Sequence, residues 1–210
     1  MKRRRPVIHK VRTIDVPIPE ALTAETLLES RLGSKRAANL AVLDAMAGLG
    51  LPRAAPRSVL AAVALARLGG DLDLAARTLS WSDFEEFCAM VVAASGYQVR
   101  KNVRLRKPTR QIDIVAESSS LVLAIDCKNW RRSAGTASLE LAALAQIERT
   151  RMLVKKTRAA KGRAYLPVLL TVLDTQVRVL SGVPVVPLHG LKEFLASVSR
   201  FDESLSFVAV

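Results

Sequence analysis

Two short apolar segments that carry acidic residues constrain the fold of this chain more than any other feature. Residues 112–117 read Ile-Asp-Ile-Val-Ala-Glu, and after a serine turn residues 124–130 read Ala-Ile-Asp-Cys-Lys-Asn-Trp. Both have the composition of β-strands, and the short turn predicts that they are neighbours in one sheet. Because side chains alternate along a strand, Asp126 and Lys128 should project from the same face, roughly 7 Å apart, with Asp113 available from the partner strand.

The surrounding segments predict a mixed α/β domain. Apolar residues at three- and four-residue spacing over 81–95 predict an amphipathic helix, with Ser82 as its N-cap and Gly96 at its end. The later elements are expected to be an antiparallel meander of strands over 97–105, 111–117 and 121–128, a long helix over 138–158, a buried strand over 165–173, a strand over 183–186 and a helix over 191–198.

The region before this domain divides into two parts. Residues 1–17 carry six Lys or Arg within the first twelve positions and show no sustained periodicity, which predicts a flexible basic arm. Residues 18–80 read as short Ala- and Leu-rich helices interrupted by glycines, which predicts a small all-helical subdomain. That subdomain either packs and dimerises or reads DNA as a helix-turn-helix. Residues 81–200 are expected to form the α/β domain, and residues 201–210 a C-terminal tail.

Net charge and cysteine usage narrow the class of protein. The 32 Lys and Arg residues outnumber 19 Asp and Glu to give +13, which favours a polyanion partner over an ordinary solvated basic surface. Cys88 and Cys127 lie in apolar segments without Cys-x-x-Cys spacing, as expected for reduced core residues of a cytoplasmic protein. No apolar run approaches the roughly 20 residues of a membrane span, so neither membrane insertion nor export is expected.

The spacing of the motifs resembles that of the PD-(D/E)xK restriction-endonuclease-like superfamily, and more narrowly its Mrr-like and archaeal Holliday-junction-resolvase-like nucleases. The resemblance covers residues 81–198. It rests on Phe84-Glu85 opening a helix that ends in Gly96-Tyr97, and on the segments 111–116 and 125–130. It implies an α/β, restriction-endonuclease-like core of αβββαβ order, a mixed sheet flanked by helices, with the all-helical N-terminal subdomain attached to it.

Site residues follow from the resemblance and from the chemistry of phosphodiester hydrolysis. Asp113 and Asp126 are the expected ligands of Mg²⁺, with Mn²⁺ able to substitute, because hard cations prefer carboxylate oxygens. The resemblance adds the main-chain carbonyl of Cys127 to the metal ligands. Lys128 would orient or help deprotonate the attacking water and offset developing negative charge. The alternative is a solvent-facing Asp113 and an ordinary ion pair between Asp126 and Lys128.

Two further residues have equally concrete alternatives. By the resemblance, Glu85 is a catalytic residue or metal ligand, but Ser82-Asp83-Phe84-Glu85 also fits a capping box. Gln146 resembles a glutamine near the scissile phosphate, although it also fits a boundary residue of a helical stripe. Residues flanking the motifs are expected to contact DNA phosphates: Arg106, Lys107, Arg110, Asn129, Arg131, Arg132 and Lys155.

The sequence therefore predicts a Mg²⁺-dependent DNA endonuclease of DNA defence or repair. It would act either as a type IV, Mrr-like restriction enzyme or as a structure-specific, resolvase-like nuclease. The alternative is a non-catalytic DNA-binding module of a repair or defence assembly, and RNA as substrate is a third reading. A homodimer is expected because two sites most simply cut two strands.

Overall fold

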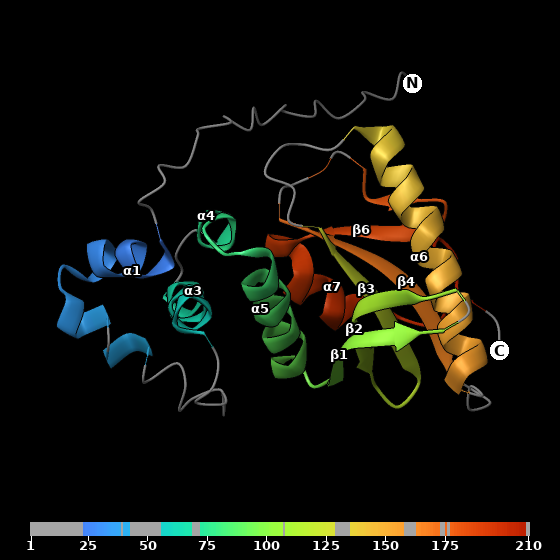
Figure 1. Cartoon of the computed structure of the whole chain (residues 1–210), viewed down its shortest axis with the longest axis horizontal. Helices are drawn as coiled ribbons and strands as arrows, with labels where there is room; N and C mark the ends of the chain where they lie inside the picture. The colour runs from blue at the N-terminus through green and yellow to red at the C-terminus, as the bar shows by residue number, and fades with distance from the viewer. Residues whose placement is uncertain are drawn as a thin grey trace, which may run out of the picture.

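A mixed β-sheet with helices on both faces forms the centre of the molecule in the computed structural model (Figure 1). The structure describes residues 23–38, 40–42, 56–68, 72–106, 108–128, 135–157, 163–172, 175 and 177–208. Residues 1–17, the expected basic arm, lie outside this described part. No helix within the described ranges is both long and apolar enough to cross a bilayer.

The order of elements confirms the predicted α/β fold. The helices are α1 (Ala24–Leu32), α3 (Arg57–Arg67), α4 (Leu72–Arg77), α5 (Trp81–Ala94), α6 (Thr136–Thr157) and α7 (Leu191–Ser197), with the 3-10 turn η1 (Leu188–Gly190). The strands are β1 (Gln98–Leu105), β2 (Arg110–Glu117), β3 (Leu121–Lys128), β4 (Ala164–Thr171), β5 (Val179–Leu180) and β6 (Val183–Pro187). Among the strands of the described residues, the two-residue β5 is the one that was not predicted, because so short a strand gives no periodic signal.

The sheet has the strand order β1-β2-β3-β4-β6-β5. The first three strands are antiparallel, as the predicted meander requires, whereas β4 is parallel to β3 and β6 is parallel to β4. A parallel neighbour requires a crossover, and α6 provides it between β3 and β4. Lys128 pairs with Thr171, and Thr171 with Pro187, so the carboxyl ends of β3, β4 and β6 lie at one edge of the sheet.

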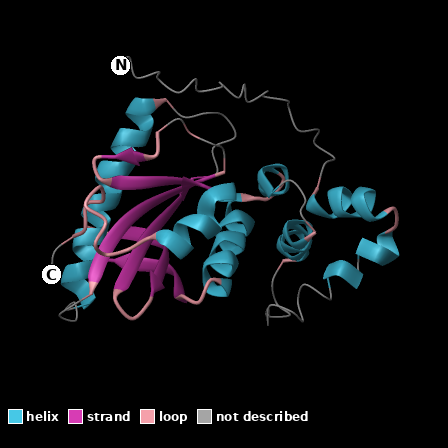
Figure 2. Ribbon diagram, turned by 180° about the vertical axis from the view of Figure 1, so that it is seen from behind, coloured by secondary structure: helices cyan, strands magenta, loops and turns pink. Residues whose placement is uncertain are grey.

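Helices cover the two faces of the sheet unequally (Figure 2). One face packs against α5 and α7 through alternate residues of the central strands, such as Ile125 and Cys127 of β3. The opposite face packs against α6, where Val122 and Ala124 of the same strand meet Leu153. Both faces of β3 are therefore covered, and the polar residues Asp126 and Lys128 lie among apolar side chains.

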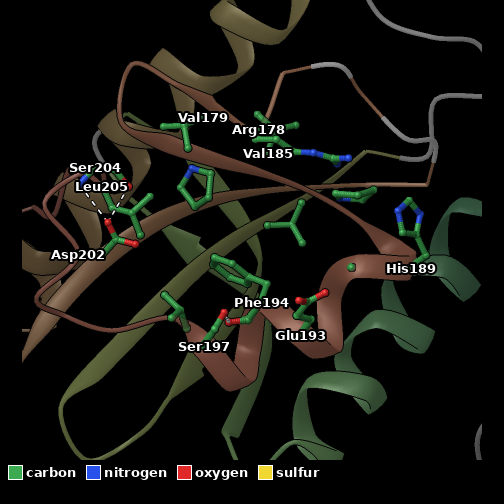
Figure 3. Close-up of a pocket in the computed structure, with 15 residues that line it drawn as sticks. Arg178, Val179, Val185, His189, Glu193, Phe194, Ser197, Asp202, Ser204 and Leu205 are labelled. Carbon is green, nitrogen blue, oxygen red and sulfur yellow. Dashed lines mark hydrogen bonds between the residues drawn. The ribbon is translucent and has the colours of Figure 1, made fainter. Parts of the chain in front are cut away.

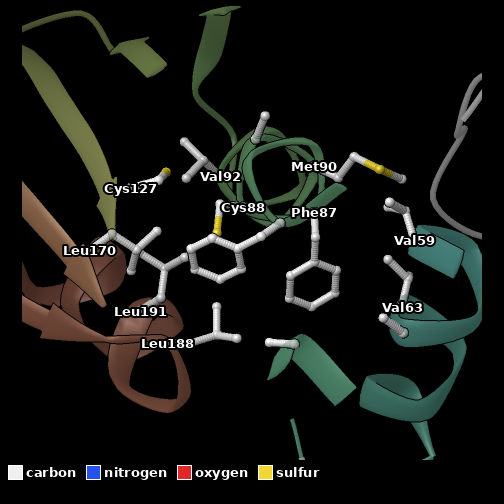
Figure 4. Packing of buried hydrophobic residues seen from close by; sticks show 14 of the residues in the cluster. Val59, Val63, Phe87, Cys88, Met90, Val92, Cys127, Leu170, Leu188 and Leu191 are labelled. Carbon is white, nitrogen blue, oxygen red and sulfur yellow. The ribbon is translucent and has the colours of Figure 1, made fainter. Parts of the chain in front are cut away.

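The N-terminal helices share a core with the sheet domain. Val59 and Val63 of α3 lie next to Phe87 and Met90 of α5, and all four belong to the buried cluster that continues onto the sheet (Figure 4). Helix α5 is thus apolar on two sides, one toward the sheet and one toward α3. The division of the chain at residue 80 stays a prediction.

The start of α5 differs from the predicted one. Ser80 is the N-cap, and its side chain accepts a hydrogen bond from the amide of Asp83 at 3.2 Å, so the prediction of Ser82 as N-cap was wrong. The capping-box alternative for Glu85 fails with it, since Glu85 accepts a hydrogen bond from the indole of Trp81 instead. The N-cap therefore lies two residues earlier than expected, which places Ser82 inside the first turn of the helix.

Candidate active site

The site is built where β2 and β3 separate. Their antiparallel ladder ends at the pair of Ile114 with Ile125. Beyond it, the Oδ2 atom of Asp113 accepts a hydrogen bond from the main-chain amide of Cys127 at 2.8 Å. A carboxylate therefore takes the place of a main-chain acceptor at this point, which satisfies a buried amide and fixes Asp113 against β3.

Asp126 and Lys128 project from the same face of β3, as the alternation of a strand requires. The Lys128 Nζ atom lies 2.7 Å from Asp126 Oδ2, and an Arg149 nitrogen of α6 lies 3.0 Å from Asp126 Oδ1. The Oδ2 atom is buried and accepts no hydrogen bond from any described residue, so the ammonium beside it is an ion-pair partner only. Asp126 is thus a buried carboxylate with one incompletely satisfied oxygen.

Gln146 connects α6 to this cluster. Its side-chain amide donates to the carbonyl of Ala124 at 2.8 Å, and its Oε1 atom accepts from Arg149 at 2.9 Å. The side chain is fully buried. Gln146 therefore lies next to the site, where it fixes the guanidinium of Arg149; a direct role at the phosphate stays a prediction.

Glu85 approaches the same cluster from the first turns of α5. The indole N–H of Trp81, one turn earlier, donates to its carboxylate, while the Trp81 side chain stays 46 % exposed. Burial raises the pKa of Glu85, the Trp81 hydrogen bond lowers it and the charge of Asp126 raises it again, with a net increase. The carboxylate is therefore within electrostatic reach of Asp126.

The pKa of Asp113 reflects its burial and the nearby acids Asp126 and Glu85. Its pKa is raised from 3.8 to about 7, because burial and the neighbouring charges of Asp126 and Glu85 outweigh the lowering effects of the Cys127 amide and of Lys128. A carboxyl group in such a place binds either a proton or a cation near neutral pH.

The donor set fits a hard divalent cation of the Mg²⁺ class. Asp126 contributes the buried oxygen without a hydrogen bond, and Asp113 contributes a carboxylate whose charge the surroundings disfavour. A residue of a strand directs its amide and carbonyl to the same side, so the Cys127 carbonyl faces the Asp113 side of β3. No group of three or more His, Cys, Asp or Glu side chains suited to a metal occurs within the described residues. Two carboxylates, a main-chain oxygen and water would therefore share the coordination.

Basic residues expected to contact DNA border this region. Arg106 and Arg110 are exposed at the β1–β2 hairpin, and Lys155 is exposed on α6. A cavity of about 480 Å³ between hairpin and helix is lined by Arg106, Lys155 and Lys156. Four other residues expected to bind DNA lie outside the described residues: Lys107, Asn129, Arg131 and Arg132.

Basic side chains of β1 that lie away from the β1–β2 turn are paired with acids. Glu117 pairs with Arg100 at 2.6 Å and with Arg163 at 2.7 Å, and Lys101 pairs with Glu86. The ion pairs of Arg100 and Lys101 therefore lie away from the hairpin turn, where Arg106 and Arg110 are exposed on the side of the strands that carries Asp113.

A second cavity, of about 470 Å³, lies between β6, α7 and the C-terminal segment (Figure 3). His189, Glu193 and Asp202 line it together with apolar side chains such as Phe194. Its lining contains none of the acids of the candidate site, so the two are separate features of the molecule.

The two cysteines are buried free thiols, as predicted. They lie close together, Cys88 on α5 and Cys127 on β3 (Figure 4). A hydrogen bond with Cys88 and burial together raise the pKa of Cys127. A thiol in these surroundings is chemically inert, so a contribution of Cys127 to the site would have to come from its main chain.

Sequence reasoning missed Arg149 and Trp81. Arg149 lies three residues after Gln146, a spacing that places both on one helix face, and Trp81 stands four residues before Glu85. These spacings were visible in the sequence. Their significance depends on Asp126, which belongs to another element and cannot be assigned as a neighbour from spacing.

An αβββαβ core with Asp113 on β2 and with Asp126 and Lys128 at the end of β3 is the arrangement expected of a nuclease-like domain of the PD-(D/E)xK superfamily. Residues 76–162 match the Mrr catalytic-domain model, described as a restriction endonuclease, a family of the PD-(D/E)xK nuclease-like superfamily. An uncharacterized protein of Archaeoglobus fulgidus is 27% identical over 132 residues, which are 62% of this chain and all of that relative. No solved structure matches the chain.

Proposed function

We propose that this protein is a Mg²⁺-dependent endonuclease that hydrolyses phosphodiester bonds in DNA. The family match supports a nuclease-like function on DNA. The observation that carries the finer proposal is the buried Asp126–Lys128 pair beside Asp113, because carboxylates and an ammonium at one place suit a cation and a phosphate together.

The residues would divide the work as follows. Asp113, Asp126 and the carbonyl of Cys127 would hold the cation, with Glu85 adjoining them. The bound cation supplies Lewis-acid stabilisation of charge and a more acidic water. Lys128 would orient that water. As a neutral amine it would accept the proton of the water, and as the resulting ammonium it would offset the negative charge that develops on the phosphate.

The substrate would lie across the hairpin side of the site. Arg106, Arg110 and Lys155 are exposed there and would contact phosphates without reading sequence. The net charge of +13 supports a polyanionic substrate. We propose a cytoplasmic role in DNA defence or repair, either Mrr-like or resolvase-like, and a homodimer whose two sites cut two strands.

Nicking of plasmid, branched and methylated DNA with Mg²⁺ or Mn²⁺ tests the proposal. Asp113→Ala, Asp126→Ala and Lys128→Ala should each slow cleavage by on the order of 10² or more, as expected for loss of a metal ligand or proton-transfer group, while DNA binding persists. Glu140→Gln, an exposed acid of α6, is the control and should cleave like wild type. Unchanged cleavage in the three site variants would remove the mechanism.

A second candidate is a DNA-binding module that does not cleave. It is favoured by one observation, that both oxygens of Asp126 already face a cationic side chain. DNA binding that weakens steeply with salt, without metal-dependent cleavage of any DNA form, would support it. Absence of binding at low salt would exclude it.

A further inference from the structure

Arg149 is the charged residue of the site that the mechanism above does not use. Its guanidinium lies 3.0 Å from Asp126 Oδ1 and donates a hydrogen bond of 2.9 Å to Gln146 Oε1. Its side chain is 21 % exposed, whereas that of Arg151 on the same helix is 60 % exposed and pairs with Glu148 within the helix. Arg149 is therefore directed into the acid cluster and not onto the outer surface of α6.

The two oxygens of Asp126 are divided between two cationic side chains. Lys128 faces Oδ2 from the same strand, and Arg149 faces Oδ1 from α6. A divalent cation that binds Asp126 has to take a position beside at least one of these oxygens. Its charge would then repel the nearer cationic side chain.

Arg149 is the partner better placed to yield. It belongs to a different element from Asp126, its stem is long, and its partial exposure gives the guanidinium a way outward. The Nη1 atom that contacts Asp126 also donates to the buried Gln146, and this hydrogen bond could hold the guanidinium at the site after it leaves the carboxylate. A planar guanidinium in that position is suited to a phosphate oxygen.

We propose that Arg149 is a built-in counter-ion that neutralises Asp126 until a divalent cation replaces it, and that it then pairs with a phosphate of the bound DNA. The inference rests on the proposed nuclease function and adds a form of regulation to it. DNA gives the displaced guanidinium a new partner, so DNA and metal each strengthen the binding of the other, as linkage requires. Metal binding without DNA stays weak.

The charges of the site agree with this exchange. Asp113, Asp126 and Glu85 can carry three negative charges, which Lys128 and Arg149 only partly offset. A divalent cation would reverse this balance and leave one positive charge in excess. A phosphodiester group carries one negative charge and would restore neutrality.

Calorimetric titration with Mn²⁺ in the absence of DNA tests the counter-ion directly. Arg149→Met keeps the apolar stem and removes the charge, so Mn²⁺ should bind about tenfold more tightly, equivalent to about 1.4 kcal/mol. Arg149→Lys keeps a competing charge and should stay near the wild-type affinity. Arg151→Met is the matched control, with the same loss of charge on the same helix, and should bind Mn²⁺ like wild type.

The same variants are then compared in plasmid nicking and in Mn²⁺ titrations with a non-cleavable phosphorothioate duplex. Arg149→Met should cleave more slowly than wild type despite its tighter metal, and the duplex should improve its Mn²⁺ affinity less than it improves that of wild type. Weaker or equal Mn²⁺ binding by Arg149→Met, with wild-type protein cleaving DNA, would overturn the counter-ion and leave the nuclease intact. Tighter Mn²⁺ binding by that variant, with no cleavage by wild type, would support the counter-ion and overturn the nuclease. Wild type that neither binds Mn²⁺ nor cleaves would overturn both.

Discussion

Asp113→Asn should make the metal-free protein more stable, and increasingly so as the pH rises. The asparagine keeps an oxygen that can accept the hydrogen bond from the Cys127 amide. It removes the negative charge that burial and the neighbouring acids Asp126 and Glu85 disfavour. The variant therefore separates the electrostatic cost of the acid from its structural contact with β3.

The expected size follows from the pKa of Asp113, which burial and the neighbouring acids raise from 3.8 to about 7. Between these values the unfolded chain has lost a proton that the folded protein still holds, so the stability of wild type falls as the pH rises. Above about pH 7 both states are ionised and the cost stays constant. At about 1.4 kcal/mol per pH unit the full cost is about 4 kcal/mol, of which about 3 kcal/mol accumulates between pH 5 and pH 8.5. We expect about 2 kcal/mol or more, since local rearrangement reduces the cost.

Urea unfolding followed by circular dichroism, with EDTA present, measures this difference at roughly pH 5 and pH 8.5. The free energy of unfolding of wild type is subtracted from that of Asp113→Asn at each pH, so that titrations shared by both proteins cancel. A difference that is the same at both pH values, or that favours wild type at the higher one, would refute the reasoning.

Three other changes test other parts of the molecule. The pKa of Glu117 is lowered because the hydrogen bonds and charges of its two arginine partners outweigh burial. The ionised carboxylate therefore stabilises the fold above the unfolded pKa of 4.5, and this stabilisation is lost as the pH falls through the folded pKa. Glu117→Gln should destabilise the protein at neutral pH and not in acid, as measured by urea unfolding. Phe87→Ala should cost about 3–5 kcal/mol in the same assay because this side chain is 1 % exposed, whereas Phe201→Ala, at 76 % exposure, should cost little. Reversing the charges of Arg106 and Lys155 should weaken DNA binding and flatten its dependence on salt, as measured by fluorescence anisotropy.

The parts of the fold that were predictable are those with a strong local signal. The apolar, strand-like composition on both sides of a serine turn identified β2 and β3, and the apolar run of β4 after a long helix indicated a parallel strand covered on both faces. The two-residue period of a strand also placed Asp126 and Lys128 on one face, as their 2.7 Å ion pair confirms. These inferences needed only neighbouring residues along the chain.

What was not predictable depends on contacts between elements. The pairing of Arg149 with Asp126 joins residues of α6 and β3, and nothing in the spacing of either segment indicates it. The N-cap of α5 was placed two residues late, at Ser82, because Ser80 and Ser82 are equally good caps by residue type. Packing decides between such alternatives, and packing is not visible in a single sequence.

The contact of Asp113 with the Cys127 amide bears on how inactive members of such a family would be recognised. A descendant that had abandoned hydrolysis would still gain from an acceptor at this position, because the amide at the strand end needs one. The presence of an acid at the position of Asp113 is therefore weak evidence for nuclease activity. Among the described residues, Lys128 makes no comparable structural contact beyond its ion pair with Asp126. Its replacement would therefore be the earlier sign that the proposed hydrolytic activity has been lost.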